Sequence, residues 1–173
     1  MRLPPVDVYR APFIAPIGHL AMQSAHAEDA LITLCASIPF EGSPDQVSQG
    51  DAAHRLRHWN DEARAFIANR VSSIGDPDLR KQAEDAIERY ASLRVSRHRA
   101  IHDAVEVGIH EAGDAVVVHA LSVEYRREKI STSVRVNSIT PEMIADLACE
   151  MYDVHQDLKA VTYSLRTTQK EKR

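Results

Sequence analysis

Hydrophobic residues in the first third of the chain recur at the spacing of amphipathic helices. Between 16 and 38 the apolar positions fall three and four residues apart, which predicts one helix that begins at a proline. The segment 39–45 contains two prolines and a glycine and is expected to be a loop. A second helix is expected to start between Ser48 and Asp51 and to carry its apolar face as far as Ile67.

A third helix is predicted from the dipeptide Asp76-Pro77, because aspartate is a good N-cap and proline fits the first helical position. Its apolar stripe consists of Leu79, Ala83, Ala86, Tyr90 and Leu93. Further steps of four along the same stripe land on Arg97 and Ile101. An arginine on an apolar stripe is unexpected, because an unpaired buried charge is costly. Such a residue is usually paired, at a cleft or at an interface.

The periodicity changes after Gly108. The segments 115–125 and 129–136 are rich in β-branched residues and alternate in part with period two, which predicts a β-hairpin around 126–128. Thr140 is then expected to cap a last helix, whose apolar stripe is interrupted by His155. The predicted inventory is therefore four helices and one hairpin, and the fold class is mainly α: an up-and-down helical bundle with a hairpin before the last helix.

Composition favours an ordinary single domain. The chain has 173 residues, 44% of them hydrophobic and 27% charged, with a formal net charge of -4. We expect one domain over 1–173, with flexible ends at 1–13 and 167–173. No apolar run approaches the ~18 residues of a membrane span, and prolines interrupt the start where a signal peptide needs an apolar stretch, so we expect a cytoplasmic protein without membrane contact. Cys35 and Cys149 lack metal-site spacing and are expected to be small core residues.

The strongest local anomaly is a run of basic residues near the end of the third helix. The segment 89–102 contains four arginines and no acid, although the chain as a whole is acidic. At ~100° per residue, Arg94, His98 and His102 lie near one helical face, while Arg99 points further away. Guanidinium groups can hold phosphodiester oxygens, so Arg94, His98 and Arg99 are candidate substrate-binding residues. The alternative is a solvated basic helix face.

These residues carry a family resemblance. The segment RHRAIH, from Arg97 to His102, fits the R(x4-6)H motif of the HEPN superfamily, in its form with a polar residue directly after the arginine, here His98. The opening segment IGHLAMQSAHAEDALITL and the late segment ITPEMIADLACEMYDVHQDL also resemble uncharacterised bacterial HEPN-like proteins. In those proteins a helix ending in arginine and histidine precedes a hairpin and a final helix. The resemblance extends over 14–165.

The resemblance implies an endoribonuclease of the toxin or defence type. Members of this superfamily often dimerise, which sets two motifs side by side in a basic cleft, and many cut RNA there without metal. By motif position, Arg97 would bind and polarise the scissile phosphate, and His102 would be the general acid or base. His98 would hold the polar site between them. The ribose 2'-OH would attack, leaving a 2',3'-cyclic phosphate and a 5'-OH. No cofactor is expected; a homodimer, RNA or a nucleotide, and an antitoxin protein are the implied partners.

Residue spacing leaves alternatives open. Five residues along an ideal helix rotate by ~140°, so Arg97 and His102 of one chain point in different directions. A site shared across a dimer, or a helix that ends before His102, would remove that difficulty. Asp103 follows the motif and could pair with the imidazole or an arginine. A non-catalytic module that binds RNA, a nucleotide or a protein, and a helical protein that only mediates assembly, are the competing hypotheses.

A metal site is a further alternative. His54 and His58, and likewise His98 and His102, are four residues apart, the spacing that puts two imidazoles on one helical face. Neighbouring arginines would oppose a dication, and neither pair has a carboxylate at a regular spacing. The remaining histidines are single and are expected to be structural: His19, His26, His110, His119 and His155.

Overall fold

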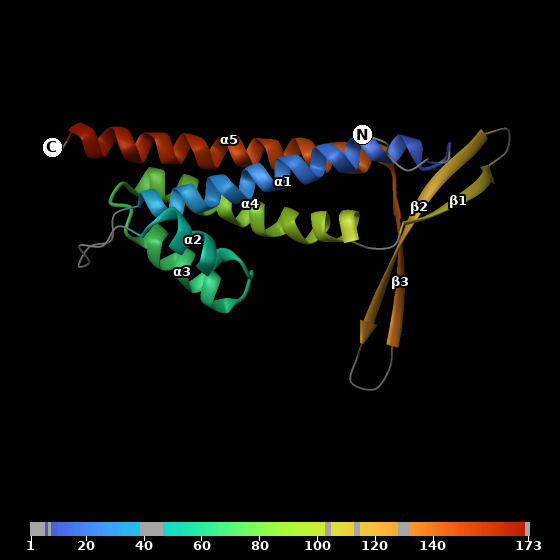
Figure 1. The fold of residues 1–173 in the computed structure, drawn as a ribbon, viewed down its shortest axis with the longest axis horizontal. Helices are drawn as coiled ribbons and strands as arrows, with labels where there is room; N and C mark the ends of the chain where they lie inside the picture. The colour runs from blue at the N-terminus through green and yellow to red at the C-terminus, as the bar shows by residue number, and fades with distance from the viewer. Residues whose placement is uncertain are drawn as a thin grey trace. The chain divides into compact units, whose positions relative to one another are not determined.

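The chain is described by a computed structural model of residues 6, 8–38, 47–102, 105–112, 115–127 and 132–171, with side chains described outside 102–137 and 169–171. The described part is mainly helical (Figure 1). Its helices are α1 (Ala11–Ser37), α2 (Gln49–Leu56), α3 (Asp61–Ser72), α4 (Pro77–His102) and α5 (Pro141–Glu171). Its strands are β1 (Val105–Ala112), β2 (Ala115–Arg127) and β3 (Thr132–Ile139).

The chain divides into two compact units. The first unit comprises Met1–Ser24 and Leu93–Glu150, and the second comprises Ala25–Ser92 and Met151–Arg173. The sheet belongs entirely to the first unit, whereas α2 and α3 belong to the second. Parts of α1, α4 and α5 belong to each unit. The expectation of a single domain over 1–173 stays a prediction.

Three helix starts agree with the sequence, which predicted Asp76 and Thr140 as caps and a start between Ser48 and Asp51. Ser48 caps α2, and its Oγ accepts a hydrogen bond from the Asp51 backbone N–H at 3.1 Å. Asp76 Oδ1 accepts bonds from two backbone N–H groups in the first turn of α4, at 2.9 and 3.1 Å. Thr140 Oγ1 accepts from the Met143 N–H at 3.2 Å. Each oxygen satisfies a donor that has no partner within its helix, so the start is encoded locally.

The first helix begins earlier than predicted. The sequence placed its start at Pro16, but α1 begins at Ala11 and contains that proline. Proline lacks an N–H and weakens a helix interior, which is why the earlier start escaped the pattern. Phe13, only 3% exposed, lies in this additional turn, and burial of an aromatic ring offsets the lost hydrogen bond.

The predicted second helix is two helices. α2 ends at Leu56, and α3 begins at Asp61. The break follows from Asn60, whose Oδ1 accepts a bond from the Ala63 N–H at 2.9 Å and caps a new helix. Trp59 lies in the connection, where its ring packs edge-on against Tyr90 of α4 at 5.4 Å between centroids. Trp59, which its spacing placed inside a helix, therefore lies in a loop and contacts Tyr90 there.

Backbone hydrogen bonds organise the three strands as an antiparallel sheet in the order β1-β2-β3. The β2–β3 pairing, from Ala120↔Ile139 to Arg127↔Thr132, overlaps the two predicted strands. The second strand begins three residues later than predicted, and Arg126 and Arg127 lie in β2 and not in the turn. β1 was missed, although it pairs with β2 along its full length, from Val105↔Ser122 to Ala112↔Ala115. Its sequence VEVGIHEA alternates Val105, Val107 and Ile109 with Glu106, Gly108 and His110, so a strand signal was present. It was missed because the change of periodicity was placed after Gly108.

In the second unit, α1 and α5 run parallel and side by side (Figure 1). The rings of His26 and His155 lie 5.5 Å apart between centroids, and Arg166 donates to Ser37 Oγ at 3.1 Å, eleven residues further along both helices. α4 runs antiparallel to them and is tied to α5 by an ion pair of 2.6 Å between Arg89 and Asp157. Fully buried side chains from α1 and α5 form the core between these helices, including Leu31, Leu34, Cys35, Val154, Leu158 and Val161.

One buried arginine joins α3 to the end of α1. Arg70 is 2% exposed, its Nε donates to the Cys35 carbonyl at 2.9 Å, and its Nη2 donates to the Ile38 carbonyl. The last carbonyls of a helix have no partner within it, so Arg70 supplies the donors that α1 lacks.

The two cysteines differ in environment. Cys35 is fully buried, as predicted, and burial raises the pKa of its thiol to about 12. Cys149 is exposed, so the prediction that it is a core residue was wrong. Ala148, which is 5% exposed, lies on the apolar stripe of α5. Cys149 is the next residue along the helix and therefore turns away from that stripe.

Candidate functional site

The predicted site residues lie in the last turns of α4, within the first unit. We call Arg94, Arg97, His98, Arg99 and His102 together the basic end of α4. Arg94, Arg97 and Arg99 are half-buried and His98 is exposed. His102 is the last helical residue, and its side chain lies outside the described residues, as does Asp103. Cations suit this position, because the C-terminal end of a helix carries partial negative charge.

Arg97 lies on the apolar stripe, as the spacing predicted. The same side of α4 carries Ala100, 2% exposed, and the half-buried Leu93 and Ile101. The Nε atom of Arg97 is buried and has no hydrogen-bond acceptor among the described residues. A buried donor without a partner costs about 1–3 kcal/mol. Arg97 therefore holds a donor whose bonding capacity the described part of the fold does not use.

Arg97 and His102 diverge along one continuous helix. α4 remains helical through His102, so the alternative in which the helix ends before this histidine was wrong. The ~140° rotation between the two positions therefore persists at the level of the backbone. Arg94, His98 and His102 share the face predicted for them, with Arg99 turned further round the helix. One copy of α4 presents a basic surface, on which positions 97 and 102 lie on different faces of the helix.

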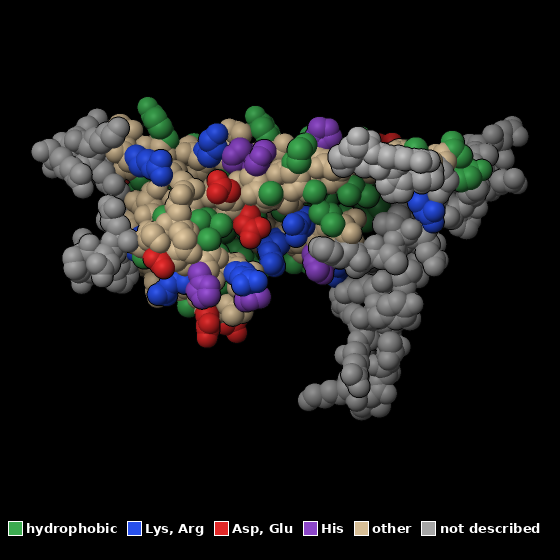
Figure 2. Space-filling view, in the orientation of Figure 1, with side chains coloured by type: hydrophobic (Ala, Val, Ile, Leu, Met, Phe, Trp, Pro, Cys, Tyr) green, Lys and Arg blue, Asp and Glu red, His purple; other side chains and the backbone are tan. Residues whose placement is uncertain are grey.

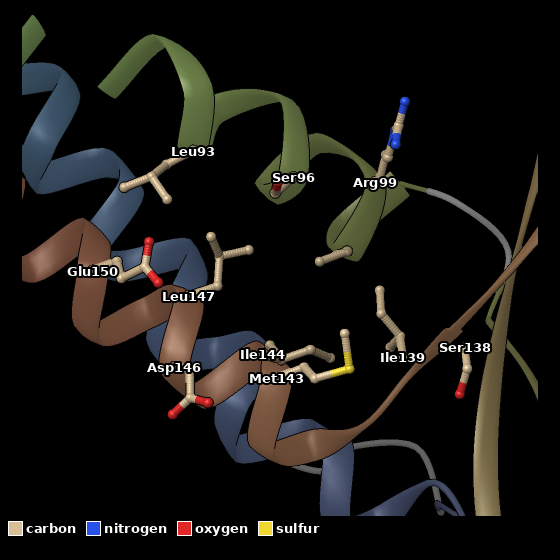
Figure 3. A pocket seen from close by; sticks show the side chains of 11 residues that line it. Leu93, Ser96, Arg99, Ser138, Ile139, Met143, Ile144, Asp146, Leu147 and Glu150 are labelled. Atoms are coloured by element: carbon tan, nitrogen blue, oxygen red, sulfur yellow. The ribbon is translucent and has the colours of Figure 1, made fainter. Parts of the chain in front are cut away.

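A cavity of about 400 Å³ lies next to Arg99, entirely within the first unit. It is formed by α4, the end of β3 and the first turns of α5 (Figure 3). Leu147, Met143 and Ile139 point towards its centre, whereas the Arg99 guanidinium points away from them. Asp146 and Glu150 are exposed and contribute carboxylates to its lining. The cavity is thus apolar within and mixed in charge at its edge, and Arg97 does not line it.

The metal hypothesis loses one of its two histidine pairs. α2 ends at Leu56, so His54 and His58 do not lie on one face of a continuous helix. No group of three or more histidine, cysteine, aspartate or glutamate side chains able to hold a metal occurs among the described residues. The other pair, His98 and His102, includes a side chain outside that set.

Sequence reasoning missed a second cluster of polar side chains, in the second unit. His26 and His155 were predicted to be single structural histidines, but their rings pack against each other. Burial, together with the positive charge of Lys159 and the neighbouring His26, lowers the pKa of His155, while Asp29 opposes that shift. The signal in the sequence was the interruption of the apolar stripe at His155. Its partner could not be identified without the packing of α1 on α5.

No protein-family model matches the chain, and no curated protein or solved structure matches it either. Membership of the HEPN superfamily therefore stays a prediction from the arginine–histidine motif and its flanking segments. None of the described helices is long and apolar enough to cross a membrane.

Proposed function

We propose that the protein is a metal-independent endoribonuclease of the toxin or defence type, which binds RNA at the basic end of α4. The observation that supports this proposal is the state of Arg97: its Nε is buried and unbonded, and it makes no salt bridge with any described side chain. A phosphodiester oxygen would supply the acceptor that this donor lacks. Arg94 and Arg99, on the same helix end, would add positive charge for the neighbouring phosphates.

Cleavage needs a base as well as a phosphate ligand. Arg97 would polarise the scissile phosphate, and His102 would take the proton from the ribose 2'-OH or protonate the 5'-leaving oxygen. The products would be a 2',3'-cyclic phosphate and a 5'-OH end. Because positions 97 and 102 are ~140° apart around one α4, the proposal pairs Arg97 of one protomer with His102 of its partner across a two-fold axis. An antitoxin that blocks this surface would be the natural regulator.

A second candidate is a non-catalytic module of the same fold, which grips RNA, a nucleotide or a protein with the same surface. The continuous helix through His102 favours it, because a single chain then offers a phosphate site without a positioned base. The two candidates differ in one respect that can be measured. Binding alone requires the arginines, whereas cleavage also requires His102.

The decisive experiment incubates the full chain, in excess EDTA, with an end-labelled RNA pool and assays new 2',3'-cyclic phosphate ends. Arg97→Ala and His102→Ala are each expected to lower the cleavage rate by about 100-fold or more, as loss of a charged or acid–base group does. Arg64→Gln removes an exposed arginine from α3 and serves as the matched control, with activity unchanged. Loss of RNA binding in Arg97→Ala, with no cleavage by the parent, would instead establish the binding module.

Mixing the two inactive variants tests the dimer. In a site shared across a two-fold axis, a mixed dimer of Arg97→Ala and His102→Ala contains one intact site. An equimolar mixture after subunit exchange should therefore recover about a quarter of the parent activity. No recovery, in a mixture shown to exchange subunits, would contradict the shared site.

A further inference from the structure

A second cavity, of about 370 Å³, lies within the second unit between α1 and α5. We call it the α1–α5 groove, and its lining consists of Asp29, Ala30, Thr33, His155, Lys159, Thr162, Tyr163 and Arg166. Its volume falls in the range of small-molecule sites. All of its residues lie outside the basic end of α4, so a ligand bound in this groove would be independent of the proposed ribonuclease function.

The groove carries an excess of positive charge. Lys159 and Arg166 face a single carboxylate, that of Asp29, and Lys159 makes no salt bridge with any described side chain. Figure 2 shows basic side chains and histidines gathered over the stretch where α1 and α5 lie side by side. A lining of this charge favours an anion.

The second cation is held in place. Arg166 donates from Nε and Nη2 to Ser37 Oγ, at 3.3 and 3.1 Å, and the Ser37 hydroxyl donates in turn to the Thr33 carbonyl at 2.7 Å. A guanidinium fixed in this way loses little conformational entropy on binding a further oxygen. The floor beneath it is closed, because Ala30 and Thr162 are 5% and 6% exposed.

Lys159 and Arg166 can reach one ligand. Their positions are seven apart in the sequence, so they lie on the same face of α5, about 10 Å apart along its axis. Both side chains are long enough to meet over that distance. Tyr163 lies between them at the rim, with 75% of its surface exposed, and it leaves the approach open.

The environment of the histidine pair also favours an anion in the groove. His155 faces His26 and Asp29 from α1, and Tyr152 and Lys159 from its own helix, and its Nδ1 lies 3.4 Å from Gln156 Nε2. Burial and the nearby positive charge lower the pKa of His155, so its charged form is disfavoured in the empty groove. A bound anion would reverse that balance. The imidazole would then gain a proton and add a third positive charge.

From this geometry we propose that the α1–α5 groove binds a phosphate monoester, whose oxygens Lys159 and Arg166 hold, with His155, which packs against His26, as a protonatable wall. The shared chemistry is a compact, doubly charged oxyanion. Inorganic phosphate, a sugar phosphate and a mononucleotide all contain this oxyanion. They differ only in the group attached to the phosphate, which would extend past Tyr163.

Calorimetric titration of the full chain tests the proposal, with inorganic phosphate, ribose 5-phosphate and a mononucleotide as separate ligands. Lys159→Gln and Arg166→Gln are each expected to weaken binding about tenfold, as loss of a charge-assisted hydrogen bond does. Ser37→Ala, which frees Arg166 without removing its charge, should weaken binding less. Lys81→Gln removes an exposed lysine from α4 and should leave the affinity unchanged. The tightest of the three ligands identifies the source of the phosphate.

Inorganic sulfate isolates the contribution of histidine, because its own charge stays constant over the pH range used. Its affinity is expected to rise several-fold as the pH falls from about 8 to about 5.5, and His155→Gln should flatten that rise. An affinity that does not change with pH would overturn the role assigned to His155. Absence of saturable binding up to about 10 mM of every ligand, or equal binding by Lys159→Gln and the parent, would overturn the proposal. Neither result bears on RNA cleavage at the basic end of α4.

Discussion

Two arginines occupy inward-facing positions of helices, one in each unit, and they differ in whether their side-chain donors are hydrogen-bonded. Arg70 in the second unit is 2% exposed and donates from Nε and Nη2 to carbonyls at the end of α1. Arg97 in the first unit is half-buried, and its Nε has no acceptor in the described part of the chain. An arginine that serves the fold uses its donors on backbone oxygens. One that keeps a buried donor unused lowers the stability of the protein, and a ligand that displaces the groups covering it would supply the missing acceptor.

The largest effect expected from this comparison is on Arg70→Met. Methionine keeps an unbranched apolar side chain but is shorter than arginine and has no donors, so the carbonyls of Cys35 and Ile38 lose their partner. Relief of the buried charge offsets part of that loss. We expect the free energy of unfolding to fall by about 3 kcal/mol and Tm to fall by about 6–12 °C. Chemical denaturation followed by circular dichroism measures the change. A decrease smaller than that of Arg89→Ala, which removes a partly exposed ion pair, would contradict the structural role.

Arg97→Met is the matched substitution in the other unit and is expected to cost little. It removes a buried donor that has no acceptor, so the free energy of unfolding should stay within about 1 kcal/mol of the parent value, or rise. The same denaturation experiment reports it. RNA binding or cleavage should nevertheless be lost, which separates function from stability. A loss of stability as large as that of Arg70→Met would show that Arg97 is a structural residue.

The smallest effect expected is on the pH dependence of stability at His155. Its pKa is lowered in the folded state from the ordinary 6.5, so the unfolded chain binds the proton more tightly. The contribution of the neutral imidazole is therefore complete above pH 6.5 and is lost as the pH falls below that value. His155→Gln should make the decrease in the free energy of unfolding between about pH 7 and 5 shallower, by less than about 0.5 kcal/mol. A steeper decrease would show that protonation of His155 stabilises the fold.

Local signals in the sequence accounted for much of the helical architecture. Asp76 and Thr140 were identified as caps, and the start of α2 was placed between Ser48 and Asp51, because a side-chain oxygen before a helix bonds to N–H groups only a few residues away. The apolar stripes of α4 and α5 were identified because helical spacing places them on one face whatever the partner is. The anomalies at Arg97 and His155 were likewise visible, as polar residues on those stripes.

Other features depended on contacts between distant segments. Trp59 was placed inside a helix by its spacing, and its packing against Tyr90 belongs instead to the break between α2 and α3. β1 is short and contains a glycine, and its pairing with β2 completes the sheet. The α1–α5 groove requires two helices more than a hundred residues apart in the chain to run parallel.

The sequence by itself determined where most helices begin, which of their faces are apolar, and that positive charge gathers at the end of α4. These properties depend on hydrogen bonds and side-chain spacing within a few residues. Only the tertiary structure decided which arginine side chains form hydrogen bonds within the fold. Arg70 is satisfied by carbonyls that lie more than thirty positions away, whereas Arg97 keeps an unbonded donor. The physical reason is that a hydrogen bond requires an acceptor at the right distance and angle, and for a buried side chain the fold supplies it.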